Sequence, residues 1–350
     1  MSAPALPLVV RAVRTGDVPA LYRMAQQTGA GFTNLPADLP ALEAKVARAL
    51  ACFARPEEAP ADDLYLFVLE DPATGALCGT CQIFARIGSQ WPFYSYRLGA
   101  LTQFSKELGR AFRAETLNLC TDLDGASEVG GLFLEAGARA AGAGRLLARS
   151  RYLFMRRHRA RFASRTIAEL RGALDEAGRS PFWEGLAGRF FGMPFDEADG
   201  FNALHGNQFI ADLMPKHPIY TSMLPEAARA SIGQPHRNGE AAMRLLQQEG
   251  FRFDCYVDIF DGGPTMVVDT DRIATLRGAR LARVAALADA GRPEGAPGAL
   301  VATGALGDFR CCIGAVAGEG EAVVLNAAAA RALGVGPGDA ILYTGLLKAE

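Results

Sequence analysis

The sequence has no long hydrophobic run and no excess of charge of either sign. No apolar stretch approaches the length of a membrane-spanning helix, and the N-terminus lacks the basic and then apolar regions of a secretion signal. The 36 basic and 38 acidic residues give a formal net charge of −2. Because no strong field attracts nucleic acid or an anionic membrane, we expect a protein that binds neither. The scattered cysteines and the lack of a visible secretion signal predict the reducing cytoplasm as its compartment.

Cysteine is also sparse, with seven residues scattered along the chain. Cys78 and Cys81 form a C-x-x-C pair, but no second pair of metal-ligand spacing accompanies them. We interpret both as small buried hydrophobic residues of a strand. Asp258 and Asp261 are the other candidates for a metal, but a turn alone explains their D-x-x-D-G-G sequence. We therefore predict no metal site.

Hydrophobic periodicity predicts a mixture of helices and strands. Residues 128–135 form an apolar strand that leads through a loop into a helix over 144–158. We expect the region 192–238 to be rich in loops. Further strands are predicted at 8–13, 64–70, 76–84, 166–170, 253–260 and 265–269, and further helices at 18–27, 41–53, 180–191 and 240–248.

The length of 350 residues exceeds what one hydrophobic core usually organises, so more than one domain is expected. The segment 290–298 is rich in Gly, Pro and Ala, as a linker would be. Short strands follow it, and residues 325–343 have the helix-then-strand pattern of small β-barrel modules. We expect a β-rich appendage there.

The segment R-A-A-G-A-G connects the strand 128–135 to the helix that follows. Its end lies at a helix N-terminus, where free backbone N–H groups and the helix dipole favour an anion. Gly142 and Gly144 allow a phosphate to approach the backbone, and Arg139 and Arg145 add positive charge. The motif predicts an anion site, and a tight turn without a ligand is the alternative.

The order of these elements resembles that of the GNAT superfamily of N-acetyltransferases. In that fold the strand before the glycine loop splays from its neighbour, and the pantetheine arm of coenzyme A (CoA) lies in the opening. The resemblance implies an α+β fold, a mixed sheet flanked by helices, extended here by a second α/β portion and the small C-terminal β-rich module. It also identifies the anion at 139–144 as the pyrophosphate of an acyl-CoA.

Nine blocks in the same order give a closer resemblance, to the arginine N-succinyltransferase family. It implies transfer of succinyl from succinyl-CoA, a cosubstrate, to the α-amino group of L-arginine in arginine catabolism. It also implies an acyl-CoA-binding core over 1–200, a substrate and catalytic extension over 201–288, and an appendage over 299–350. The blocks are TGAGFTNLP (28–36), WPFYSYRLG (91–99), SEVGGLFL (127–134), AELRG (168–172), SPFWEGLAGRFF (180–191), FIADLMPKHPIY (209–220), IGQPH (232–236), EGF (249–251) and IFDGGPT (259–265).

Histidine is the usual residue for proton transfer near neutral pH, and the chain has four. His158 lies in a basic segment and is expected at the exposed end of a helix. His217 precedes a proline and is expected in a structural turn. The residues alone do not choose between His205 and His236, but the resemblance places the family's proton donor at His236.

The resemblance also places a succinyl-CoA contact at Leu132. A backbone N–H on the splayed strand is the expected donor to the oxyanion. Gly130 and Gly131 stand where the family more often has bulkier residues, which implies extra room beside the thioester.

An arginine substrate requires acidic partners for its guanidinium and basic partners for its carboxylate. The sequence does not choose among the candidates. The acidic ones are Glu128, Glu169, Asp258 and Asp261, and the basic ones are Arg97 and Arg171.

Three functions stay open at this point. The first is an arginine N-succinyltransferase in which the amine attacks directly in a ternary complex, with no acyl-cysteine intermediate. The second is an acyltransferase that prefers ornithine or another amine or acyl-CoA. The third is a non-catalytic CoA-binding subunit. We expect a homo-oligomer or a pairing with a paralogous subunit.

Overall fold

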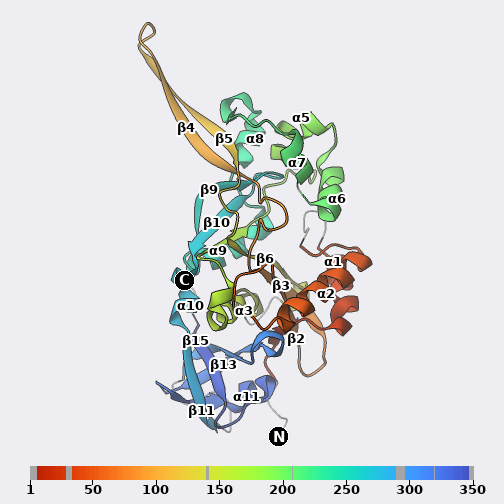
Figure 1. Ribbon diagram of the computed structural model, residues 1–350, viewed down its shortest axis with the longest axis vertical. Helices are drawn as coiled ribbons and strands as arrows, with labels where there is room; N and C mark the ends of the chain where they lie inside the picture. The colour runs from red at the N-terminus through yellow and green to blue at the C-terminus, as the bar shows by residue number, and fades with distance from the viewer. Residues whose placement is uncertain are drawn as a thin grey trace.

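The computed structural model describes residues 6–28, 34–138, 142–206, 208–288, 296–318 and 320–346. The molecule is elongated, with a β-hairpin projecting at one end and the C-terminal module at the other (Figure 1). One mixed sheet of 15 strands runs through these residues in the order β12-β15-β11-β14-β13-β1-β2-β3-β6-β7-β10-β9-β4-β5-β8. None of the helices in the described ranges is long and apolar enough to span a bilayer.

The strands and helices of the first 278 residues come in runs rather than in strict alternation, as in an α+β fold. The strands are β1 (Val9–Ala12), β2 (Leu64–Glu70), β3 (Leu77–Phe84), β4 (Ser95–Ser105), β5 (Arg110–Cys120), β6 (Ser127–Leu134), β7 (Arg165–Glu169), β8 (Ile219–Tyr220), β9 (Arg252–Asp258) and β10 (Pro264–Asp269). The helices are α1 (Val18–Ala25), α2 (Leu39–Ala54), α3 (Ala143–Arg157), α4 (Pro181–Gly185), α5 (Gly188–Phe191), α6 (Phe195–His205), α7 (Gln208–Leu213), α8 (Glu226–Ser231), α9 (Glu240–Gln248) and α10 (Ala274–Gly278).

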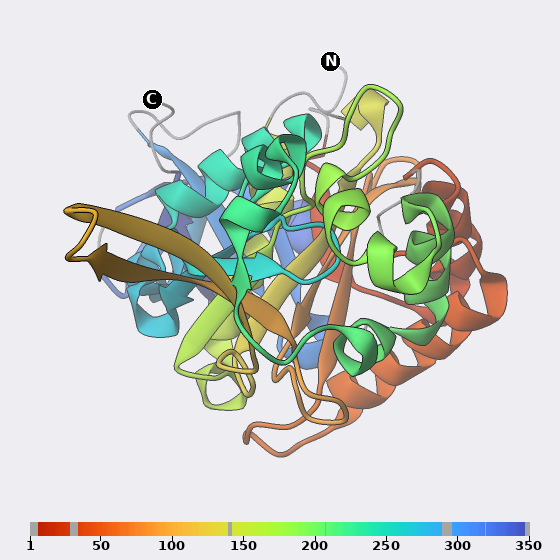
Figure 2. The same cartoon turned by 90° about the horizontal axis from the view of Figure 1, so that it is seen from above.

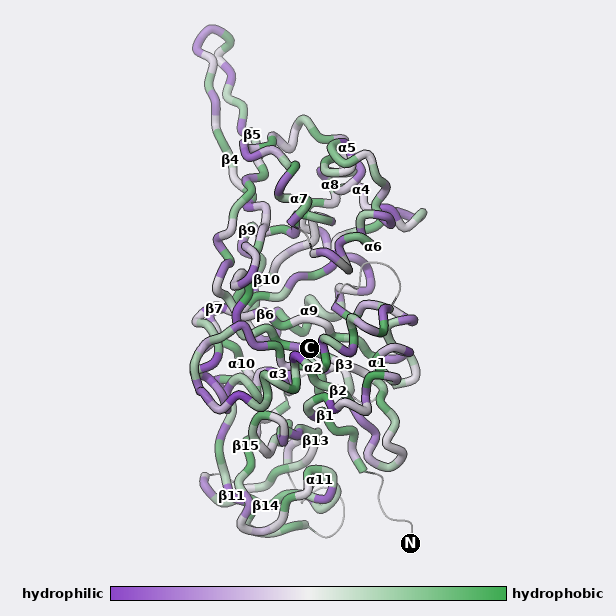
Figure 3. The backbone as a smooth tube through the Cα atoms, turned by 45° about the vertical axis from the view of Figure 1, so that its right-hand side comes forward, coloured by the Kyte–Doolittle hydropathy of each residue, from purple (hydrophilic) through white to green (hydrophobic). Residues whose placement is uncertain are grey.

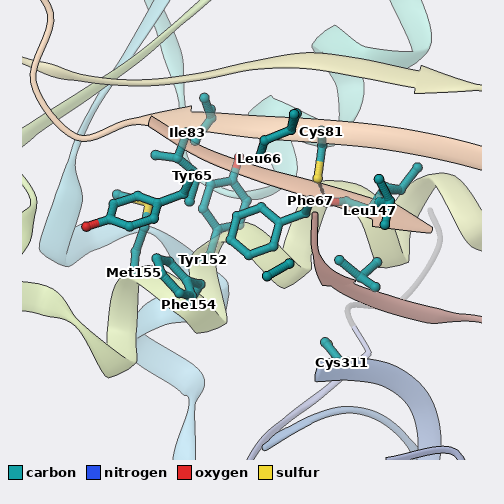
Figure 4. Packing of buried hydrophobic residues seen from close by; sticks show 14 of the residues in the cluster. Tyr65, Leu66, Phe67, Cys81, Ile83, Leu147, Tyr152, Phe154, Met155 and Cys311 are labelled. Carbon is teal, nitrogen blue, oxygen red and sulfur yellow. Dashed lines mark hydrogen bonds between the residues drawn. The ribbon is translucent and has the colours of Figure 1, made fainter. Parts of the chain in front are cut away.

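The main core lies between the middle of the sheet and α3. Figure 4 shows side chains of β2 and β3 interdigitating with Tyr152, Phe154 and Met155 of α3. The rings of Phe67 and Phe154 meet edge to face at 5.1 Å, and the Cys81 thiol contacts the carbonyl oxygen of Leu147 at 3.4 Å. This face of the strands is apolar and closely packed, which fixes α3 against the sheet.

The opposite face of the same strands meets α2 and the segment before it. Gln82 alternates with Cys81 along β3 and so faces away from α3. Its amide donates to the Asn34 side-chain oxygen at 2.5 Å, and the Arg48 guanidinium of α2 lies 6.0 Å from the centre of the Phe84 ring. Polar contacts are therefore mixed with apolar ones on this side of the sheet.

The C-terminal module is a small barrel. Its elements are β11 (Arg280–Ala288), β12 (Gly298–Thr303), β13 (Arg310–Ala317), β14 (Ala322–Asn326), α11 (Ala327–Leu333) and β15 (Ala340–Gly345). An additional pairing of β12 with β13 closes the five strands, and β13 pairs in turn with β1 of the core. The expected β-rich module, with its helix followed by a strand, is confirmed.

A long hairpin projects from the other end of the molecule, as Figures 1 and 2 show. β4 and β5 pair from Ser95↔Cys120 to Ser105↔Arg110, whereas β8 joins β5 only at Thr116 and Leu117. Hydrophobic and hydrophilic stretches alternate along the hairpin (Figure 3). We call residues 99–113 the arm. Its exposed large apolar residues are Leu101, Phe104, Leu108 and Phe112.

Two predictions for the middle of the chain are wrong. The region 192–238, expected to be rich in loops, contains α6, α7 and α8. These helices bury only a few residues each against the cluster around Trp183, so their sequences lack a long apolar stripe. The helix expected over 180–191 is divided into α4 and α5, although Ser180 caps its start as the Ser-Pro pair predicts.

Candidate active site

The centre of the molecule contains two parallel strands that part. β6 and β7 pair only at Ser127↔Thr166 and Glu128↔Ile167, at the start of both strands. Beyond this point their register ends, although each strand continues. The opening therefore lies between the second half of β6 and the end of β7.

A bulge in β6 accompanies this opening. Thr80 is opposite Phe133 and Gln82 is opposite Gly130, so Gly131 and Leu132 together face one residue of β3. Gly131 has a φ of +57°, and a Cβ there would lie 2.9 Å from the Gln82 side chain. Glycine is therefore required at this position by both conformation and space. The half-buried side chain of Leu132 packs on the edge of the main core.

The N-terminus of α3 lies directly after β6. Gly142 is the N-cap in the left-handed conformation, with a φ of +81°, and its carbonyl accepts the Leu146 N–H at 2.9 Å. Gly144 and Arg145 lie in the first helical turn. The first N–H groups of a helix have no intrahelical acceptor, so this end can bind an anion. The structure brings Gly142, Gly144 and Arg145 together, whereas Arg139 lies outside the described residues.

His236 lies beside the end of β7. Its backbone N–H donates to the Arg171 carbonyl at 2.8 Å, and Pro235 bridges to Gly172. The His236 Nδ1 accepts the Asn238 N–H at 3.2 Å, which leaves the proton of the neutral ring on Nε2. Burial, Arg171 and Arg237 lower the pKa of His236. The imidazole is thus held neutral with Nε2–H as its free donor.

Four carboxyl groups at the same end of β7 interact electrostatically, those of Glu128, Glu169, Asp258 and Asp261. Burial raises the pKa of Glu128 to about 7, and Asp258 adds to the rise while Lys45 opposes it. The pKa of Glu169 is raised well above its usual value by burial, Asp258, Glu128 and Asp261. The four acidic candidates from the sequence therefore form one cluster.

Asp258 and Asp261 differ from the two glutamates because they accept backbone N–H groups, Asp258 through one oxygen and Asp261 through both. Asp258 accepts the N–H groups of Phe260 and Asp261 at 2.7 and 2.9 Å. Asp261 accepts those of Gly172 and Gly263 at 2.7 and 2.8 Å. These bonds support the interpretation of D-x-x-D-G-G as a turn.

The two basic candidates, Arg97 and Arg171, lie in different surroundings. Arg97 lies at the base of the hairpin, 3.4 Å from Asp122 and over the Tyr256 ring. Arg171 lies near His236 and Asp261: with burial it lowers the pKa of His236, and it opposes the rise to about 7 that burial and Asp258 cause in the pKa of Asp261. Arg171 is thus the candidate that belongs to the site.

The prediction for His158 is wrong. His158 is 5% exposed, its Nδ1 lies 2.8 Å from Glu58, and its Nε2 accepts the Leu306 N–H at 3.2 Å. It joins the end of α3 to the turn before β13. A tertiary contact at a helix end leaves no mark in the local sequence, which explains the error.

Sequence reasoning also missed Lys45, Gln82, Ser95 and Thr265 near the carboxyl groups. Lys45 is held with its amine donating to the Asn34 carbonyl at 2.5 Å, and burial lowers its pKa to about 7. Gln82 and Thr265 lie in otherwise apolar strands, which was the available signal. Lys45 offered none, since lysine is ordinary on a helix.

A mixed sheet with two parallel strands that part before a glycine-capped helix defines this chain as a GNAT-like N-acyltransferase. The comparisons specify the family. Residues 8–275 match the family model described as arginine N-succinyltransferase beta subunit, and residues 280–345 match that of its C-terminal domain. The chain belongs to the arginine N-succinyltransferase family.

Individual relatives agree with this assignment. An arginine N-succinyltransferase of Citrobacter koseri is 42% identical over 343 residues, which cover 98% of this chain and 99% of the relative. One of Escherichia coli is 41% identical over 345 residues, with the same coverage of each chain. The solved arginine/ornithine succinyltransferase subunit AI of Pseudomonas aeruginosa is 33% identical, with a TM-score of 0.89 over 98% of this chain and 100% of that one.

Proposed function

We propose that this protein transfers the succinyl group of succinyl-CoA to the α-amino group of L-arginine, giving N2-succinylarginine and CoA in arginine catabolism. The observation that carries the proposal is the parting of β6 and β7 between an anion-binding helix end and His236. Membership of the family supports the choice of both substrates.

The site offers a role for each part of succinyl-CoA. The N–H groups at the start of α3, with Gly142, Gly144, Arg139 and Arg145, would bind the pyrophosphate. The pantetheine arm would lie in the opening, and the Leu132 N–H on the bulged strand would donate to the oxyanion as the amine attacks. Such a donor is typically worth about 10²–10³-fold in rate.

His236 would assist the departure and protonation of the CoA thiolate. Its Nε2–H is free to donate a hydrogen bond that stabilises the departing thiolate, because Nδ1 is occupied by a backbone N–H. The proton that the attacking amine loses would then neutralise this thiolate, which gives free CoA as the thiol and leaves the imidazole neutral. The pKa of Cys81, the cysteine opposite the bulge, is raised to about 11 by burial, so it is a poor nucleophile at neutral pH. Direct attack by the amine in a ternary complex therefore fits this site better than an acyl-cysteine intermediate.

Incubation of the purified chain with L-arginine and succinyl-CoA tests the proposal. We expect stoichiometric free CoA and N2-succinylarginine by mass spectrometry, and no mass increase of the protein with succinyl-CoA alone. A succinylated protein would contradict direct attack. CoA binding without turnover would instead support a non-catalytic subunit.

Ornithine is a specific second candidate for the acceptor, because the name of the Pseudomonas aeruginosa relative includes it. Comparison of kcat/KM for arginine and ornithine, each with succinyl-CoA and acetyl-CoA, decides between these substrates. A higher value for ornithine would replace the proposed acceptor and retain the enzyme class.

We also propose that the chain forms a homo-oligomer through the arm. Phe104 is 64% exposed, Leu108 72% and Phe112 56%, on a hairpin that reaches beyond the body. An isolated two-stranded hairpin is marginally stable in water, so a second copy would supply the missing contacts. Light scattering should give a multiple of 37.1 kDa for the wild type and a smaller mass for a Phe104→Ser, Phe112→Ser variant. A monomeric wild type would leave a paralogous subunit as the partner.

A further inference from the structure

Buried polar groups without partners gather on one side of the parting strands. Among the described residues, the buried side-chain atoms that lack a hydrogen-bond partner include Gln82 Oε1, Ser95 Oγ, Glu169 Oε1 and Thr265 Oγ1. Gln82, Ser95 and Thr265 are each fully buried. An unsatisfied buried polar group costs about 1–3 kcal/mol, so such a concentration requires a reason.

Strand register places these groups on the same face of the sheet. Glu128 of β6 is level with Phe84 of β3 and with Ile167 of β7. Gln82 lies two positions before Phe84 and Glu169 two positions after Ile167, so both share the face of Glu128. Glu169 lies level with Thr265.

The same face continues onto β9 and β4. Thr265 lies level with Tyr256, and Asp258 lies level with Ser95. Because Tyr256 and Asp258 are two positions apart on β9, they point to the same side. The face therefore extends without interruption from Gln82 to Ser95, on the side opposite α3.

Charge on this face is not neutralised by direct pairing. Glu128 is 8% exposed, and no hydrogen bond or ion pair joins its carboxyl group to any described residue. Lys45 interacts with it electrostatically but donates instead to the Asn34 carbonyl. The Thr265 hydroxyl lies near enough to Glu169 to lower its pKa, yet it makes no hydrogen bond of good geometry. Acceptors thus outnumber donors.

The location connects these acceptors with the reaction. Glu169 lies two positions past Ile167, the last residue of β7 that pairs with β6, where these two strands part. Leu132 lies four positions from Glu128 along β6, which is at most about 13 Å at the usual rise per residue, because the bulge at Gly131 shortens the strand. An extended arginine, with its guanidinium at the glutamates and its α-amine at the thioester, fits within that separation.

We propose that this face is the seat for the cationic side chain of the acceptor, and that Glu128 and Glu169 bind its guanidinium. The inference rests on the proposed function. A guanidinium has five N–H donors and no acceptor, which complements two carboxylates beside the oxygens of Gln82, Ser95 and Thr265. Asp258 and Asp261 hold the turn behind the seat.

Isosteric substitution tests the assignment. Glu128→Gln and Glu169→Gln should each raise KM for arginine about tenfold or more, while kcat changes less than about threefold, because a charge-assisted bond remote from the thioester contributes mainly to binding. Citrulline, the neutral isostere of arginine, should be a poor substrate for the wild type, and the variants should lose most of this discrimination.

Asp254→Asn is the matched control, because Asp254 lies on β9 with an exposed side chain. It should leave both constants unchanged. Thermal melting and the Kd for CoA would show that the glutamine variants are folded with an intact cosubstrate site. If the folded variants match Asp254→Asn in KM and in selectivity for arginine over citrulline, the assignment is overturned.

A direct binding measurement separates this inference from the proposed function. If the wild type does not succinylate arginine, the proposed function fails, but calorimetric titration with arginine still addresses the seat. Arginine binding that is lost in Glu128→Gln and kept in Asp254→Asn supports the seat. No binding to the wild type, or equal binding to all three proteins, overturns it.

Discussion

The two faces of β3 and its neighbouring strands differ in the side chains that they bury. Towards α3, the side chains are apolar and meet ring to ring, as with Phe67 and Phe154 at 5.1 Å. On the other face, Gln82 and Glu169 keep buried oxygens without partners. The first arrangement stabilises the fold, whereas the second lowers stability by itself. The comparison indicates that one face holds the enzyme together and the other is completed by its substrates.

The largest expected effect comes from the apolar face. Phe154→Ala should lower the free energy of unfolding by about 3–5 kcal/mol, because it removes a fully buried ring and leaves a cavity. Urea denaturation measures the change. Phe190→Ala, at a position that is 52% exposed, is the control and should change stability by less than about 1 kcal/mol. Equal losses in both variants would contradict this account of the core.

His236→Ala should instead lower activity strongly and leave stability almost unchanged. The expected loss in kcat is about 10²-fold or more, in line with positioned proton transfer, with little change in unfolding free energy because the ring is only half-buried. Steady-state kinetics and denaturation on the same preparation provide the comparison. His205→Ala is the control, since His205 is exposed at the end of α6. Unchanged turnover in His236→Ala would exclude it as the proton donor.

Binding of arginine should strengthen as the pH rises through about 7. Below this pH Glu128 is protonated and Lys45 is charged, since burial raises one pKa to about 7 and lowers the other to about 7. Above it, the carboxylate is ionised and the amine is neutral, and both changes favour a cation. Asp258 and Glu169 also interact electrostatically with Glu128, and the positive charge of Arg48 faces Lys45.

Calorimetry without succinyl-CoA should therefore show Kd for arginine falling at least about tenfold between pH 6 and pH 8, since one group with a pKa near 7 already accounts for about tenfold. Glu128→Gln should reduce this pH dependence to the part that Lys45 contributes. A profile that keeps its slope in the variant would assign the titration to another group.

The smallest effect concerns the second core, around Trp183, which contains Val257 of β9 and so adjoins the acceptor face. The Ser180 hydroxyl accepts the Trp183 N–H at 3.2 Å and caps α4. Ser180→Ala should cost about 1 kcal/mol of unfolding free energy without affecting KM. Ser164→Ala, at an exposed side chain, serves as the control. A change in KM would show that α4 positions the site more directly than the contacts indicate.

Much of the fold was predictable because its signals are local. The hairpin of β2 and β3, the strand β6 and the helix α3 follow from periodicity and turn residues within single segments. The loop-rich interpretation of 192–238 failed because the short helices there gain their stability from Trp183 and its neighbours rather than from their own pattern. The division at 1–200, 201–288 and 299–350 remains a prediction. β9 and β10, within its second part, pair directly with β7 and β4 in the same sheet.

The sequence by itself determined the family, the α+β class and the glycines that start α3, because each depends on residues close together in the chain. Only the tertiary structure decided that Glu128, Glu169, Gln82, Ser95 and Thr265 share one face, since five different strands contribute them and register alone aligns them. It also decided which acidic residues are occupied by a turn and which keep free oxygens. Hydrogen-bond satisfaction is a property of the folded surroundings, and no spacing in the chain reports it.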